Sequence, residues 1–148
     1  MTMNMHRLAI STVNHHDVES RDFVWNELFR HNAQYSPINQ LDFTIQTKSD
    51  GDILGVAMGE SKFDWMILQY LAVKVEFRGL GLGRRLLNEV IELAISRKCK
   101  GIHLDTFEFQ ARDFYAKFGF FVYGEIEDHP TGYRRYFMKL PLASSCDR

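Results

Sequence analysis

The sequence predicts an α/β (α+β) protein in which a mixed, mainly antiparallel sheet is flanked by helices. Two observations support this fold class. Short segments of apolar or alternating side chains predict strands, and three segments with apolar residues at helical spacing are placed among them. The 148 residues have the length of one domain and can bury about two thirds of the unfolded surface without disulfides. We therefore expect a single domain over residues 1–148.

The first third of the chain predicts a strand, a helix and a hairpin. Residues 7–13 alternate between apolar and polar side chains, which is typical of a strand. Residues 17–31 place their apolar side chains on one helical face, and Asp17 is of a type that caps helices. Two strand-like runs within residues 41–61 then surround a turn signal at residues 49–51, so we expect a hairpin.

The middle of the chain predicts a central strand followed by an amphipathic helix. Residues 64–75 are almost continuously apolar, so we expect a strand with both faces buried. Residues 82–100 follow with polar side chains on one side of a helix and an apolar face on the other. That face consists of Leu86, Leu87, Val90, Ile91 and Ala94.

The last third predicts a strand, a short helix and two final strands. Residues 101–107 form the strand, and residues 110–119 have apolar side chains at i, i+3, i+4 and i+7. Gly119 is placed where a glycine commonly ends a helix. Residues 120–128 and 133–142 are the final strands, separated by a turn-rich connector.

Composition narrows the range of partners and locations. The net charge of −1, from 18 basic and 19 acidic side chains, argues against a nucleic-acid partner, because proteins that bind nucleic acid usually carry an excess of basic side chains. Cys99 and Cys146 are far apart, as expected for reduced thiols of a cytoplasmic protein. The first residues lack the apolar segment of a secretion signal, and no run approaches the roughly 20 apolar residues of a membrane span. We expect a cytoplasmic protein with no membrane partner.

Three alternating glycines separate the expected central strand from the helix after it. Gly79, Gly81 and Gly83 are flanked by Arg78 and Arg84. At a helix N-terminus the first N–H groups are unpaired, and glycines let an anion approach them without intervening side chains. Such a loop is suited to binding a phosphate or pyrophosphate. A Walker A loop would need Lys and Ser/Thr after the glycines, and a dinucleotide fingerprint would need GxGxxG instead of GxGxG. The alternative is a plain strand-to-helix turn with solvated arginines.

This loop resembles the acetyl-CoA signature of the GNAT superfamily of N-acetyltransferases. The similarity includes Leu71-Ala72-Val73 before the loop and the segment FYAKFGF at residues 114–120, which is similar to a later family motif, LYxKxGF. The two motifs stand in the family's order and span about residues 64–140. The resemblance implies a GNAT-like fold with splayed central strands, one acetyltransferase domain and acetyl-CoA as co-substrate.

The resemblance also implies roles for individual residues. The strand before the loop would be bulged, and backbone N–H groups near residues 71–73 would hold the pantetheine and polarise the thioester carbonyl. Tyr115 would protonate the departing thiolate. Two positions depart from the family: Val75 stands where proline is common, and Glu108 where asparagine is common, with Gln110 as a substitute. The pyrophosphate would be held by the amides of Arg78, Gly79, Leu80, Gly81, Leu82, Gly83 and Arg84.

The general base is left open by the sequence. An acceptor ammonium must lose a proton, directly or through water. His103 and Asp105 fall on one face of their strand, where they form either a proton relay or a structural hydrogen-bonded pair. His15-His16-Asp17 has no third ligand at a convincing spacing, so no metal is predicted. The candidate general bases are a water molecule and the side chains of Glu76, His103, Asp105, Glu108, Asp128 and His129.

The expected function is acetyl transfer from acetyl-CoA to the primary amine of a small molecule, by direct attack through a tetrahedral intermediate. Two alternatives stay open: a non-catalytic acyl-CoA-binding or regulatory module, and a protein or tRNA N-acetyltransferase. Residues 133–136 are Tyr-Arg-Arg-Tyr on the last strand, where strand alternation would expose half of them. There they would shape an acceptor pocket, a homodimer face or an ordinary surface.

Overall fold

The structure, a computed structural model, describes residues 9–143, so Cys146 and the first two residues of the expected strand over 7–13 lie outside it. The chain divides into a unit that ends at Ile38 and a unit that begins at Asn39. The first unit contains α1 (Val18–Ala33), and Asp17 caps it by accepting from the Ser20 N–H at 2.8 Å, as expected. This hydrogen bond lowers the pKa of the Asp17 carboxyl.

The expected first strand is wrong for the residues that can be checked. Residues 9–13 form no strand in the described part of the chain. Alternation predicts which face of a strand would be buried, but a strand also needs a neighbour to satisfy its backbone groups. Residues 9–13 carry the pattern without that pairing.

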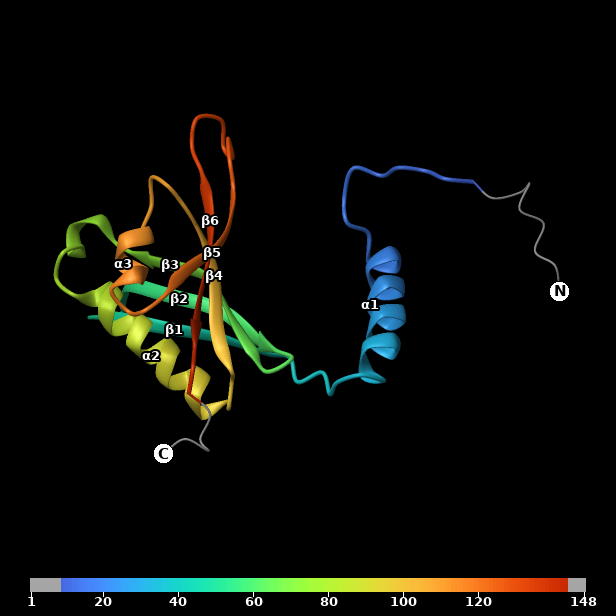
Figure 1. The fold of residues 1–148 in the computed structure, drawn as a ribbon, viewed down its shortest axis with the longest axis horizontal. Helices are drawn as coiled ribbons and strands as arrows, with labels where there is room; N and C mark the ends of the chain where they lie inside the picture. The colour runs from blue at the N-terminus through green and yellow to red at the C-terminus, as the bar shows by residue number, and fades with distance from the viewer. Residues whose placement is uncertain (1–8, 144–148) are drawn as a thin grey trace. The chain divides into compact units, whose positions relative to one another are not determined.

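The second unit is built on one six-stranded sheet with the order β1-β2-β3-β4-β6-β5 (Figure 1). All neighbouring strands are antiparallel except β3 and β4, which confirms the mixed, mainly antiparallel sheet. The turn between the first two strands uses Asp50 and Gly51, both at positive φ, as the turn signal predicts. The strands are β1 (Leu41–Ser49), β2 (Asp52–Lys62), β3 (Trp65–Val73), β4 (Gly101–Phe107), β5 (Phe121–Ile126) and β6 (Arg135–Pro141).

Helix α2 (Leu82–Ser96) packs across β1 to β4 and forms the main cover of the sheet within this unit (Figure 1). Its apolar face is buried as expected, apart from Ile91, which is partly buried. A short 3-10 helix, η2 (Val75–Phe77), precedes it. Helix α3 (Arg112–Ala116) is shorter than the predicted helix, and the chain leaves it through Gly119 at φ +94°.

Strand β3 is buried on one face only, which corrects the expectation that both faces are covered. Met66 and Leu68 are buried against the core, whereas Trp65 and Ile67 on the other face are only partly buried. Tyr70, which follows a bulge in the strand, is 67% exposed. The difference arises because α2 covers one face of the sheet, which a run of apolar residues cannot reveal.

The two central strands separate after a short contact. β3 and β4 pair at only three positions, Trp65–Gly101, Met66–Ile102 and Ile67–His103. A bulge follows at Gln69, because Gly59 pairs with Leu68 and Met58 pairs with Tyr70. The bulge and the splay are the two features that the GNAT resemblance implies, and both are present.

Leu87→Ala should destabilise the protein by about 2–5 kcal/mol, since Leu87 is fully buried between α2 and the sheet and its truncation leaves a cavity. Urea unfolding measures the change. Ile95→Ala is the matched control, because Ile95 lies on the same helix and is 43% exposed. Equal losses in the two variants would contradict the packing described.

Candidate active site

A cavity of about 500 Å³ occupies the gap between β3 and β4. It brings together many of the residues singled out in the sequence, from four separate segments. Residues 69–73 of β3 form one wall, and β4, the loop after it and α3 form the other. Among the predicted residues, the cavity is lined by Leu71, Ala72, Val73, Arg78, Asp105, Gln110 and Tyr115.

The edge of β3 that faces this cavity carries unpaired backbone donors. The Lys74 N–H donates to the Leu54 carbonyl on β2 at 2.8 Å. Backbone groups of successive strand residues point to opposite sides, so the N–H groups of Val73 and Leu71 point away from β2 and toward the gap. Consistently, the Val73 carbonyl accepts from Arg78 Nε at 3.1 Å. The N–H of Ala72 points toward β2 by the same alternation.

The glycine loop leaves open space where an anion can approach. Gly79 and Gly81 have φ of +77° and +81°, and a Cβ at either would meet no atom within 4 Å. Gly81 is the N-cap of α2 and offers no side chain to the first N–H groups of the helix, those of residues 82–84. These donors and the positive end of the helix dipole suit a phosphate group.

The third glycine lies beside α3. A Cβ at Gly83 would lie 3.6 Å from the Phe114 ring, which is ordinary van der Waals contact, so a small side chain would fit there. Gly79 and Gly81 therefore need glycine for their backbone conformation, whereas the packing at Gly83 does not require it.

Tyr115 is buried, and its side chain also reaches the cavity. The ring packs against Phe114 and Phe120, with centroids 5.2 Å and 5.8 Å apart. Burial, and secondly the negative charge of Asp105, raise the pKa of Tyr115 to about 12. The phenol is therefore neutral and a hydrogen-bond donor throughout the physiological range.

Asp105 pairs with Arg135 and not with His103. Arg135 Nε lies 2.8 Å from Asp105 Oδ2, between neighbouring strands β4 and β6. The interpretation of His103 and Asp105 as a hydrogen-bonded pair is therefore wrong, because the cation on the next strand takes that place. Burial lowers the pKa of His103, opposed by the charge of Asp105.

Most of the other candidate bases hold loops in place or lie elsewhere. Glu108 Oε2 accepts from the Arg134 N–H at 3.0 Å, and Asp128 Oδ1 accepts from the Gly132 N–H at 2.6 Å. Glu76 belongs to the 3-10 helix before the glycine loop. Of the six candidate side chains, all described by the structure, Asp105 is the one that lines this cavity.

A buried threonine orders the turn between β4 and α3, and sequence reasoning missed it. Thr106 Oγ1 accepts from the Ala111 N–H at 3.3 Å and lies 3.2 Å from Gln110 Oε1. The same Gln110 oxygen accepts from the Phe107 N–H at 2.9 Å. The Gln110 carbonyl is thus used internally, which leaves its amide N–H groups as donors. A polar residue at the buried end of a strand was the available signal.

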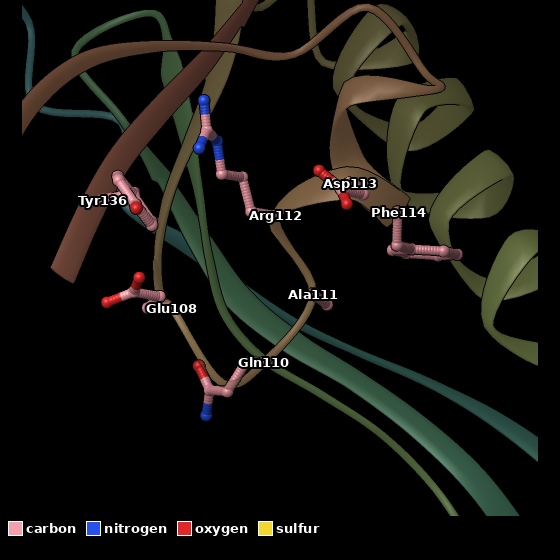
Figure 2. Close-up of a pocket in the computed structure, with 7 residues that line it drawn as sticks. All are labelled: Glu108, Gln110, Ala111, Arg112, Asp113, Phe114 and Tyr136. Atoms are coloured by element: carbon pink, nitrogen blue, oxygen red, sulfur yellow. The ribbon is translucent and has the colours of Figure 1, made fainter. Parts of the chain in front are cut away.

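A second hollow of about 360 Å³ lies beside the cavity and shares Gln110 and Ala111 with it. Figure 2 shows its lining, in which the Arg112 side chain projects from the start of α3 toward the strands. The Arg112 guanidinium lies over the Tyr136 ring, 4.7 Å from the centroid. This cation–π contact fixes the entry to α3 against β6.

In the described range 9–143, no group of three or more His, Cys, Asp or Glu side chains is arranged to hold a metal ion. Over the same range, no helix combines the length and apolarity needed to cross a membrane.

Comparison with known proteins identifies the family. The model of the Acetyltransferase (GNAT) family matches residues 10–120. The chain belongs to this family, and it is an acyltransferase. The expected fold class and enzyme class are thereby confirmed.

Relatives of this GNAT chain include enzymes of known name. It is 32% identical over 83 residues to blasticidin-S acetyltransferase of Streptomyces morookaense, covering 55% of this chain and 61% of that protein. The crystal structure of an acetyltransferase from Bacillus cereus matches with a TM-score of 0.80 at 28% identity, covering 89% of this chain and 98% of the other. A Bacillus anthracis protein in complex with acetyl coenzyme A matches with a TM-score of 0.62 at 20% identity, covering 69% and 64%, and shows the fold alone.

The raised pKa of Tyr115 predicts a specific alkaline instability. Its folded pKa of about 12 lies above the unfolded value of 10, so stability present below pH 10 is lost as the pH rises toward 12. The loss from this group should reach about 2 kcal/mol. Urea unfolding between pH 9 and 11.5 should show a steeper decline for the wild type than for Tyr115→Phe. Parallel declines would contradict the raised pKa.

Proposed function

We propose that this GNAT acetyltransferase transfers the acetyl group of acetyl-CoA to a primary amine of a small molecule. The observation that carries the proposal is the cavity at the splayed strands. It is lined by the β3 edge with its unpaired backbone donors, by Arg78 at the start of the glycine loop and by a neutral phenol. The names of two similar proteins support it. One relative is a blasticidin-S acetyltransferase, and one structural neighbour is complexed with acetyl coenzyme A.

The residues present fit the two ends of acetyl-CoA. The open backbone of residues 78–84 would hold the pyrophosphate, since the side-chain-free positions Gly79 and Gly81 stand next to the start of α2. The N–H groups of Leu71 and Val73 would donate to the amide carbonyls of the pantetheine arm. The Gln110 amide, whose oxygen is already engaged, would add a further donor.

The reaction requires an amine, a thioester, a group that accepts the amine's proton and a group that donates to the departing sulfur. The amine nitrogen forms a bond to the acetyl carbon, the carbon–sulfur bond breaks, and the sulfur receives the electron pair. A backbone N–H at the bulged part of β3 would stabilise the oxyanion. The amine's proton leaves to Asp105 or to water. Because the pKa of Tyr115 lies above the roughly 8.5 of a free thiol, its phenol acts chiefly as a hydrogen-bond donor to the departing sulfur.

Gly81→Asp should abolish acetyl-CoA binding, because a carboxylate would repel the pyrophosphate and the left-handed backbone would be strained. Calorimetric titration with acetyl-CoA measures the effect, with CoA, ATP and NAD as ligand controls. Gly51→Asp is the matched variant, since Gly51 also has positive φ and open space but lies in the β1–β2 turn. Unchanged affinity in Gly81→Asp, or a wild-type preference for ATP or NAD, would contradict the proposal that residues 78–84 bind the pyrophosphate of acetyl-CoA.

Tyr115→Phe should lower turnover by about 100-fold while leaving acetyl-CoA affinity nearly intact, since only the donor to sulfur is lost. Release of free thiol, measured across a panel of primary amines, gives the rate. Calorimetry on the same variant checks that the cofactor site is preserved. An unaltered rate with an accepted amine would place the proton donor elsewhere.

A further inference from the structure

Two aromatic side chains are left uncovered on either side of the cavity. Tyr70 comes from β3 and Phe109 from the loop after β4, and both line the same cavity. Tyr70 is 67% exposed and Phe109 is 55% exposed. Large apolar rings converging on a pocket are typical of a surface that a ligand covers.

This aromatic side of the cavity faces away from helix α2. Tyr70 pairs with the exposed Met58, whereas the next residue, Leu71, pairs with the buried Ala57 on the α2 side. On β4, Asp105 alternates with the buried Leu104 and Thr106, so its side chain also points away from the core. The glycine loop opens α2, on the opposite side of the sheet. Under the proposed function, a second substrate would therefore enter from the aromatic side, away from the glycine loop.

The Phe109 ring is held in place by its neighbours. It stacks on Phe107 at 5.4 Å and 11°, and Tyr133 meets it edge-on at 4.9 Å and 81°. Tyr133 belongs to the connector between β5 and β6. Two hydrogen bonds between Glu108 and Arg134 join the loop to the connector. The Glu108 N–H donates to the Arg134 carbonyl at 2.8 Å, and the Glu108 carboxylate accepts from the Arg134 N–H at 3.0 Å. The aromatic wall is thus formed before any ligand binds.

A carboxylate is available next to this wall. Asp105 Oδ2 is bound by Arg135, and within the described residues no side chain is paired with Oδ1. Asp105 is partly exposed and lines the cavity together with Phe109. An ammonium group at this position would form a second ion pair with the same carboxylate.

We propose that the acceptor is a primary amine carried by a planar aromatic or heteroaromatic ring, with the ring between Tyr70 and Phe109 and the ammonium at Asp105. The inference rests on the proposed function, because it names the acceptor of the same reaction. A flat ring would pair with both exposed aromatic side chains, and such pairing adds affinity beyond the area buried. We expect the two contacts together to give a preference of about tenfold over a non-planar ring of the same size.

The test compares 2-phenylethylamine with 2-cyclohexylethylamine, which share the ammonium and differ in planarity. Calorimetry gives the affinity of each amine for the wild-type protein, both with saturating CoA and without it. We expect the phenyl amine to bind about tenfold more tightly, and Phe109→Leu to reduce that preference to about threefold, because the contact with Tyr70 is kept. Phe121→Leu is the matched control, because Phe121 is 48% exposed on β5 and lies outside the cavity lining.

Equal affinities, or no binding of either amine, would overturn the inference. It would also be overturned if Phe109→Leu weakened CoA binding and left amine binding unchanged, because the ring would then belong to the cofactor site. The proposed function is judged separately by the acetyl-CoA titration of the wild type. Amine preference is measured without CoA as well, so a failure of cofactor binding leaves this readout intact.

Discussion

The parallel contact between β3 and β4 is the constraint on which the site depends. Three residue pairs hold the strands together, and one of them places Gly101 beneath the Trp65 ring, where any side chain would overlap the indole. The end at which β3 and β4 pair is reinforced by the Lys100 N–H, which donates to the Asp64 carbonyl at 2.6 Å. Because the strands are fixed at this end and diverge beyond it, the N–H groups of Leu71 and Val73 on that edge have no partner on β4.

The two sides of the cavity differ in chemistry because alternate residues of the same strands face opposite ways. On the helical side, Gly81 and the start of α2 offer backbone donors and no carboxylate. On the other side, Asp105 and Phe109 offer negative charge and an apolar ring. An anionic donor and a cationic acceptor would thus meet at the bulge from opposite faces, each attracted to its own side.

Local patterns predicted much of this arrangement. The spacing of Leu86 to Ala94 predicted the buried face of α2, and residues 101–107 were predicted as a strand with the observed bounds. The glycines predicted an open helix N-terminus because conformational freedom is a local property. The resemblance supplied the splay and the bulge, which no periodicity predicts. The roles given to residues 71–73, 78–84 and Tyr115 stay predictions.

The failures concern pairing between distant parts of the chain. Asp105 and Arg135 are 30 residues apart, and only the register of β4 with β6 makes them partners. Likewise, alternation over residues 7–13 and the apolar run over 64–75 do not reveal whether a neighbouring strand or a covering helix exists. Thr106 was missed because its hydrogen bonds depend on a turn that forms around it.

The position of Gly83 beside Phe114 has a consequence for the size of the carrier molecule. Gly83 lies in the first turn of the helix that begins at the glycine loop, a Cβ there would lie 3.6 Å from the Phe114 ring, and that ring lies 5.2 Å from the Tyr115 ring. The start of α2 and the phenol are therefore close neighbours on two adjacent helices. Under the proposed function, a carrier whose thioester is attached at the wrong distance from its phosphates would bind at one end and miss the other.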